Sequence, residues 1–240
     1  MAFQSQDHTV LNTGARSAAA SMDMGLRAYM LRVYNYMASG LALTGIVAML
    51  TASSETMVNA IFGTGLSWVV MLAPLAFILV LSFGIHKMKS STAQLVFWMF
   101  ATVMGLSMAS IFLAFTGESI ARVFFITAGT FAGMSLYGYT TKRDLSGMGS
   151  FLMMGLIGII IASIVNIFLD STALQFVVSV IGVLVFVGLT AYDTQRIKSI
   201  YSALDASDVA TKKAIMGALT LYLDFINLFM MLLQLFGKRE

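Results

Sequence analysis

The chain has 240 residues, of which 59% are hydrophobic and only 10% are charged, with a formal net charge of +3. Soluble domains carry about 25% charged residues, so this composition argues against an ordinary soluble domain and favours a membrane protein. There is no cysteine, which excludes disulfides and thiolate metal sites.

Apolar stretches follow one another along almost the whole chain after a polar start. Residues 1–28 contain no apolar core of a signal peptide, and we interpret them as a cytoplasmic N-terminal tail that is mostly disordered. Each later stretch is about 20 residues long and lacks the two-residue alternation of membrane β-strands. We therefore predict an all-α membrane protein in which residues 29–240 form one domain of seven transmembrane helices: Tyr29–Thr51, Leu66–Ile85, Ala93–Phe115, Ala121–Tyr139, Gly147–Leu169, Leu174–Tyr192 and Ala214–Phe236.

Basic residues are distributed unevenly between the two ends of these predicted helices. Eleven of the 14 Lys and Arg residues lie in the tail, the entry to the first stretch, and the second, fourth and sixth connections. Basic residues gather on the cytoplasmic side, so the N-terminus is predicted to be cytoplasmic. Lys238 and Arg239 fit this pattern less well, and a re-entrant last segment that returns to the cytoplasm is the alternative.

Small residues also repeat inside the predicted helices. Gly129 and Gly133 form a small-xxx-small pair, which predicts close packing of that helix against a neighbour. Pro74 lies inside the second stretch and can kink it.

The strongest functional signal is an ionisable residue inside an apolar stretch, because burying a charge in a membrane is costly. Asp224 lies well inside the last stretch, and its spacing from Thr220 and Asn227 places all three on one helix face. Such a polar face should meet protein or water rather than lipid. Hydrogen bonding between helices is the structural alternative.

Asp193 ends the sixth stretch, with Thr190 on the same helix face. It can be a solvated carboxylate paired with Arg196, or it can meet Asp224, because a single loop joins the two helices. Counted from nearby lysines, Asp193 lies about 8 Å and Asp224 about 16 Å into the membrane, so helix tilt or an earlier start of the last helix must absorb the difference. If the two meet, we expect them to titrate together and hold one shared proton near neutral pH.

Several other functions can be set aside from missing motifs. The last stretch contains no lysine that could bind retinal, and Asp224 lacks the Gly-x-Gly that precedes the second aspartate of intramembrane aspartyl proteases. Hydrolase and nucleotide-binding motifs are absent as well. We therefore expect a protein that is not an enzyme and does not bind nucleic acid.

Four segments resemble the Bax inhibitor family, and more specifically its bacterial branch. They are Tyr192-Asp193-Thr194-Gln195, Leu221-Tyr222-Leu223-Asp224-Phe225-Ile226-Asn227-Leu228-Phe229, Asp144-Leu145-Ser146 and Asn166-Ile167-Phe168. The resemblance covers roughly residues 27–236. It implies a seven-helix fold with the last helix central in the bundle, and a location in the bacterial cytoplasmic (inner) membrane.

The resemblance also implies a function. In this family two aspartates at the matching positions act as a pH-responsive latch on a calcium leak. By this resemblance, Asp193 and Asp224 would be the pH sensor, the gate and the calcium ligands of a cation leak channel. The channel would need no cofactor besides calcium. The neighbouring polar face would support them through Thr190, Arg196, Thr220 and Asn227. Two further residues, Arg32 and His86, are candidate charge partners of the aspartates.

This sequence departs from the family in the second stretch. Bacterial relatives carry an acidic residue there and an arginine at its cytoplasmic end, whereas this chain has Pro74-Leu75-Ala76 and then His86. His86 can replace the arginine only when it is protonated. Arg32 can instead be a topology anchor, because its long side chain reaches the interface.

The alternative function is regulation without transport. Some bacterial relatives restrain a membrane-bound ATP-dependent protease, and the polar tail with Asp7, Arg16 and Asp23 would then be the contact. The expected partners are therefore calcium ions and the lipid bilayer, together with such a protease under this alternative.

Overall fold

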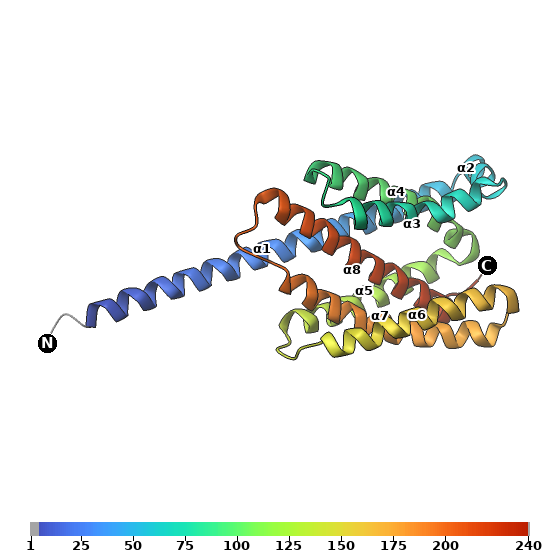
Figure 1. Ribbon diagram of the computed structural model, residues 1–240. Helices are drawn as coiled ribbons and strands as arrows, with labels where there is room; N and C mark the ends of the chain where they lie inside the picture. Colours follow the sequence, from blue (N-terminus) through green and yellow to red (C-terminus); the bar gives the residue numbers. More distant parts are fainter. Residues whose placement is uncertain (1–4, 240) are drawn as a thin grey trace.

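The computed structural model describes the backbone of residues 5–239 and the side chains of residues 23–239. Almost all of this part of the chain is helical (Figure 1). The helices are α1 (Ser5–Ala52), α2 (Glu55–Phe62), α3 (Leu66–Gly84), α4 (Ser90–Ala114), α5 (Gly117–Thr140), α6 (Ser146–Leu169), α7 (Thr172–Ser199) and α8 (Ser207–Phe236).

Seven of these helices are long and apolar enough to cross a membrane, and each corresponds to one of the seven predicted stretches. The predicted fold class is therefore confirmed. The short helix α2, which lies between the first and second spans, was not predicted. Its first turn is capped by Ser54, whose side-chain oxygen accepts a hydrogen bond from the backbone N–H of Met57.

The N-terminal tail differs from the prediction. We expected disorder, but α1 begins at Ser5, and its first half extends away from the bundle in Figure 1. The physical reason is continuity. The tail contains no proline, includes the alanine run Ala18–Ala20, and continues without a break into the first span, so a helix nucleated by the span can propagate outward. Residues 1–4 of the predicted tail lie outside the described residues.

The last helix is the most buried span. In its most apolar window 61% of the residues are buried, against 11% in the corresponding windows of α3 and α6. It packs against α1, α4, α5 and α7, which gives it the central place that was expected. The helices α3 and α6 pack mainly on α4 and α7, and neither makes extensive contact with α8.

The far end of α8 decides between the two predicted courses of the C-terminus. The helix runs without interruption to Phe236, and the chain then meets the connection between α4 and α5. The backbone N–H of Thr116 donates to the carbonyl of Lys238 (3.0 Å), and the N–H of Lys238 donates to Ser119 Oγ (2.9 Å). The last segment is therefore not re-entrant, and the C-terminus lies at the opposite end of the bundle from the start of α8.

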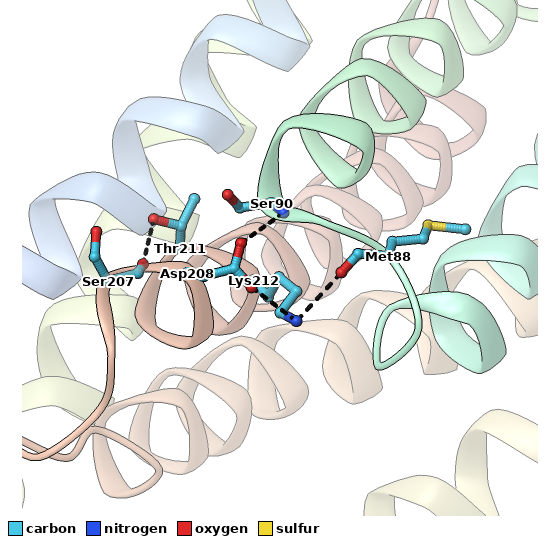
Figure 2. A network of polar contacts seen from close by, with 6 residues as sticks. All are labelled: Met88, Ser90, Ser207, Asp208, Thr211 and Lys212. Atoms are coloured by element: carbon cyan, nitrogen blue, oxygen red, sulfur yellow. Dashed lines mark hydrogen bonds and ion pairs between the residues drawn. The ribbon is translucent and has the colours of Figure 1, made fainter.

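The near end of α8 is held by a polar network with the connection between α3 and α4 (Figure 2). Asp208 accepts a hydrogen bond from the backbone N–H of Ser90 (2.9 Å), so it caps the start of α4. Its other carboxylate oxygen pairs with Lys212 Nζ at 2.9 Å, and Lys212 also donates to the carbonyl of Met88 (3.2 Å). These contacts fix the first turns of α8 outside the aspartate-bearing part of the helix.

Close helix contact occurs at different glycines from those predicted. A Cβ added at Gly129 or Gly133 would meet no other atom within 4 Å, so this pair does not lie at a helix interface. At Gly138, by contrast, a Cβ would collide with the backbone of Ala191. The tight approach of α5 to α7 therefore depends on Gly138, which the spacing pattern did not select.

Candidate functional site

Asp193 of α7 and Asp224 of α8 lie side by side in the structure. Their carboxyl groups are close enough to interact directly, and both residues are buried, with exposed fractions of 8% and 5%. The difference in depth that the sequence implied is absorbed by α8, which begins at Ser207 rather than Ala214. The two aspartates thus meet although they lie at different distances from the ends of their helices.

One oxygen of the pair has no protein partner. Asp224 Oδ2 is buried and accepts no hydrogen bond from any described residue. Two ionised carboxylates offer only acceptors to each other and repel. A shared proton or a bound cation would remove the repulsion, and either would give the unpaired oxygen a partner.

Carboxylate oxygens suit a calcium ion, but the protein supplies few of them here. Within the described residues, no group of three or more His, Asp or Glu side chains is close enough to hold a metal ion. Calcium takes six to eight oxygen ligands. A cation at Asp193 and Asp224 would therefore need neutral protein oxygens and water to complete its coordination.

A cavity of about 710 Å³ reaches the aspartates from the side of α3 and α6. Its outer walls are apolar side chains of these two helices, and Asp193 and Asp224 lie on its inner surface. Thr220 and Asn227, predicted on the same face, line it too. Each donates a hydrogen bond to a carbonyl of its own helix, at 3.1 Å and 2.8 Å, so its side-chain oxygen keeps acceptor capacity toward the cavity.

A second cavity of about 340 Å³ adjoins the first toward the end of α6. The two share three lining residues, and the rest of the second lining is mostly polar. Oxygen-bearing side chains therefore continue from the aspartates toward the end of the bundle where the C-terminus lies. The shared residues are Ser163, Ile167 and Met231, and the polar ones are Asn166, Asp170, Gln175 and Gln234.

The residue after Asp193 joins three helices. Thr194 Oγ1 is hydrogen-bonded to Ser135 Oγ of α5 (2.9 Å), and Ser135 Oγ is hydrogen-bonded to the Tyr34 hydroxyl of α1 (2.6 Å). This chain of hydroxyls and the close contact of Gly138 with Ala191 hold α7 against α5. In this position of α7, Asp193 faces α8.

Gln195 holds the connection between α5 and α6. Its Oε1 accepts from the N–H of Leu145 (2.9 Å), and its Nε2 donates to the carbonyl of Arg143 (2.8 Å). In the same connection, hydrogen bonds from the side chain and then the backbone of Ser146 hold the pKa of the exposed Asp144 carboxyl below its usual value. The segment Asp144-Leu145-Ser146 and the segment around Gln195 are therefore in direct contact.

The remaining predicted site residues are placed unequally. Thr190 is fully buried and donates to the carbonyl of Phe186 (2.7 Å), and Arg196 is the cation that acts on Asp193. Arg32 instead donates to Thr211 (3.3 Å), and His86 is exposed just after α3. Neither Arg32 nor His86 lines the aspartate cavity. Of the three, only Arg196 is near enough for its charge to act on Asp193, and it lines a different cavity.

Sequence reasoning missed the polar residues that α6 and the start of α7 add to this site. A signal was present, because Ser163 and Asn166 are three residues apart in an otherwise apolar stretch and so share one helix face. Gln175 gave no comparable signal, because it lies near the start of its helix, where polar residues are common.

Comparison with known proteins assigns the family. The family profile described as "Inhibitor of apoptosis-promoting Bax1" matches residues 26–240. The chain belongs to the Bax inhibitor family. Among similar members, "Uncharacterized protein RP147" of Rickettsia prowazekii is 52% identical, over 92% of this chain and 93% of its own length. "Inner membrane protein YbhL" of Escherichia coli K12 is 49% identical, over 90% of this chain and 94% of its own length. This Bax inhibitor family protein is thus a multi-pass membrane protein, and its similarity to these relatives extends over about nine-tenths of both chains.

Proposed function

We propose that this member of the Bax inhibitor family is a pH-sensitive calcium (cation) leak of the bacterial inner membrane, gated by Asp193 and Asp224. The observation that carries the proposal is the buried, unpartnered Oδ2 of Asp224. It lies beside a second carboxyl group at the inner surface of a cavity within the membrane-spanning part. Helix packing alone gives no reason to leave a buried carboxylate oxygen unsatisfied.

The chemistry of the pair suits a latch. A pair that shares one proton carries one negative charge and one charge-assisted hydrogen bond, which ties α7 to α8. A further proton removes the charge that attracts a cation. Loss of the shared proton leaves two repelling carboxylates, which favour separation of the helices or binding of a divalent ion. Either change alters the balance between closed and open states.

The surrounding cavities support a path on one side of the latch. The adjoining cavities described above carry oxygen-bearing side chains from the pair toward the C-terminal end of the bundle. At the basic end, a separate cavity of about 310 Å³ lies between α7 and the α5–α6 connection and shares no lining residue with the aspartate cavity. Under this proposal, a cation crosses when α7 and α8 part at the aspartates and open the aspartate cavity toward the basic end.

The direct test is calcium flux into liposomes that contain only the purified protein, measured over a series of pH values. The parent should show flux that changes with pH. Asp193→Asn and Asp224→Asn should each flatten this dependence, because each removes one of the two titrating groups while keeping its size. Glu118→Gln is the matched control, because Glu118 is an exposed acid at the start of α5 that lines none of these cavities.

Two results would count against the proposal in different ways. If both asparagine variants keep the pH profile of the parent, the aspartates are not the latch. If the parent shows no flux at any pH, the protein is not a leak.

A regulatory role is the second candidate, and the extension of α1 favours it. The helix has 48 residues, but its predicted membrane-spanning stretch begins only at Tyr29, so a long helical arm is available to a partner (Figure 1). If the protein restrains a membrane-bound ATP-dependent protease, removal of residues 2–22 should abolish the restraint. Asp224→Asn should leave it intact. Degradation of a membrane substrate in vesicles that contain both proteins measures this, and equal restraint by the trimmed and full chains would contradict it.

A further inference from the structure

A cavity of about 520 Å³ lies between α1 and α5, away from the aspartates and near the end of the bundle where basic residues gather. We call it the α1–α5 cavity. The two helices do not pack extensively against each other, and the wall between them is formed by Met30, Leu31, Phe131, Ala132 and Leu136. Leu31 and Leu136 are exposed, with exposed fractions of 54% and 63%, so the cavity opens toward the surrounding bilayer.

The interior of this cavity suits only an apolar occupant. Its polar groups are Tyr34 and Ser135, which are hydrogen-bonded to each other at 2.6 Å. Ser135 is hydrogen-bonded in turn to Thr194 at 2.9 Å. Since these hydroxyls already satisfy one another, a polar ligand would lose its hydration and find little in return.

The mouth of the cavity has the opposite character. Arg27 lines it two residues before the predicted membrane-spanning stretch of α1, and its side chain is exposed. Asp23 lies one turn earlier on α1 but forms no ion pair with Arg27. On the α5 side, Lys198 Nζ donates to the carbonyl of Tyr139 (2.8 Å) and lies 5.0 Å from its ring centre, and Tyr139 lines the same cavity. Arg27 is therefore the cation of the cavity lining, and Lys198 contacts the lining residue Tyr139.

We propose that the α1–α5 cavity binds an anionic phospholipid from the leaflet at the basic end of the bundle. Its phosphate would meet the Arg27 guanidinium, whose fork of donors matches phosphate oxygens. One acyl chain would lie between α1 and α5. The site is separate from the proposed ion path and does not depend on it.

The position of the opening favours a lipid over a helix of another protein. The exposed side chains of Leu31 and Leu136 border it, so the bilayer itself supplies acyl chains at this point. A single acyl chain is thinner than a helix and can enter through this opening. The phosphate then remains at the interface, where tyrosines such as Tyr139 are usually found.

The test is native mass spectrometry of the full chain, released from detergent with phosphatidylglycerol or phosphatidylcholine of identical acyl chains. The parent should retain phosphatidylglycerol in preference. Arg27→Gln should weaken that preference roughly tenfold, because a charge-assisted contact is lost. Ala132→Phe should reduce binding of both lipids, because the larger ring fills the cavity. Ala132 is exposed to the cavity and the bilayer, so the ring displaces no packed neighbour.

Lys142→Gln is the matched control, because it removes one positive charge from an exposed connection outside the α1–α5 cavity. It should keep the preference of the parent. Equal retention of the two lipids by the parent, or an undiminished preference in Arg27→Gln, would overturn the proposal. Undiminished binding of both lipids by Ala132→Phe, confirmed as folded by its elution volume, would overturn the placement of the acyl chain. Leu136→Trp repeats that test at a second lining position.

Discussion

The two polar faces of α8 are built differently. Toward α1 and α4, the Tyr222 hydroxyl is hydrogen-bonded to Thr44 Oγ1 (2.7 Å), Thr44 donates to the carbonyl of Ala101 (2.8 Å), and the Tyr222 ring packs against Phe100. Both hydroxyls described on this sealed face, those of Tyr222 and Thr44, have protein partners. Toward α3 and α6, Asp224 faces a cavity, and its Oδ2 has no partner among the described residues.

The difference indicates what each face is for. Buried polar groups that serve packing are normally hydrogen-bonded within the protein, as on the sealed face. A buried carboxylate left partly unsatisfied costs stability, and a functional need is the simplest reason to keep it. Substitutions on the sealed face should therefore change stability, and substitutions on the cavity face should change transport.

The largest expected effect on stability comes from Tyr222→Ala. Tyr222 is fully buried, so its removal leaves a cavity and should lower the free energy of unfolding by about 3–5 kcal/mol. Reversible unfolding in mixed micelles measures this. Phe83→Ala is the control, because Phe83 is 79% exposed and should contribute little. Equal stability of the two variants would show that the sealed face does not stabilise the bundle.

A smaller effect is expected for Tyr222→Phe, which keeps the ring and removes only the hydroxyl. Thr44 can still donate to Ala101, so no buried donor is left without a partner. Loss of one hydrogen bond between membrane helices should cost about 0.6–1 kcal/mol. A double-mutant cycle with Thr44→Val in the same unfolding assay should give a coupling energy of that size. Strictly additive effects would show that this hydrogen bond does not stabilise the fold.

The smallest effect is expected at the exposed start of α8. Asp208 there pairs with Lys212 and caps α4 (Figure 2). Because Asp208 is exposed, Asp208→Asn should lower stability slightly at low salt and less at high salt, where ions screen the attraction. Unfolding at two salt concentrations checks this. A loss larger than that of Tyr222→Phe would show that the ends of α8, rather than its sealed face, hold it in place.

The parts of this architecture that depend on local sequence could be predicted. The spans follow from the lengths of apolar runs, and the cavity face of α8 follows from the spacing of Thr220, Asp224 and Asn227. Gly129 and Gly133 show where local spacing stops being informative. The pattern was present, but which helix face meets a neighbour depends on the whole bundle, and the contact formed at Gly138 instead.

Contacts between distant segments could not be predicted for the same reason. The pairing of Tyr34 with Ser135 joins residues 101 positions apart, and that of Thr44 with Tyr222 joins residues 178 positions apart. The single loop between the two helices allowed Asp193 and Asp224 to meet, and the family resemblance implied it, although counting residues from the helix ends gave them different depths. The early start of α8 at Ser207, which resolves the difference, has no strong signal in the sequence.

The central claim is that the cavity face of α8 carries transport and the sealed face carries stability. The most direct measurement compares the initial rate of calcium entry into liposomes over a pH series for the parent, Asp224→Asn and Tyr222→Phe, at equal protein content. Asp224→Asn should give a flat profile, and Tyr222→Phe should give the parent's profile despite its lower stability. A flattened profile for Tyr222→Phe, or the parent's profile for Asp224→Asn, would contradict it.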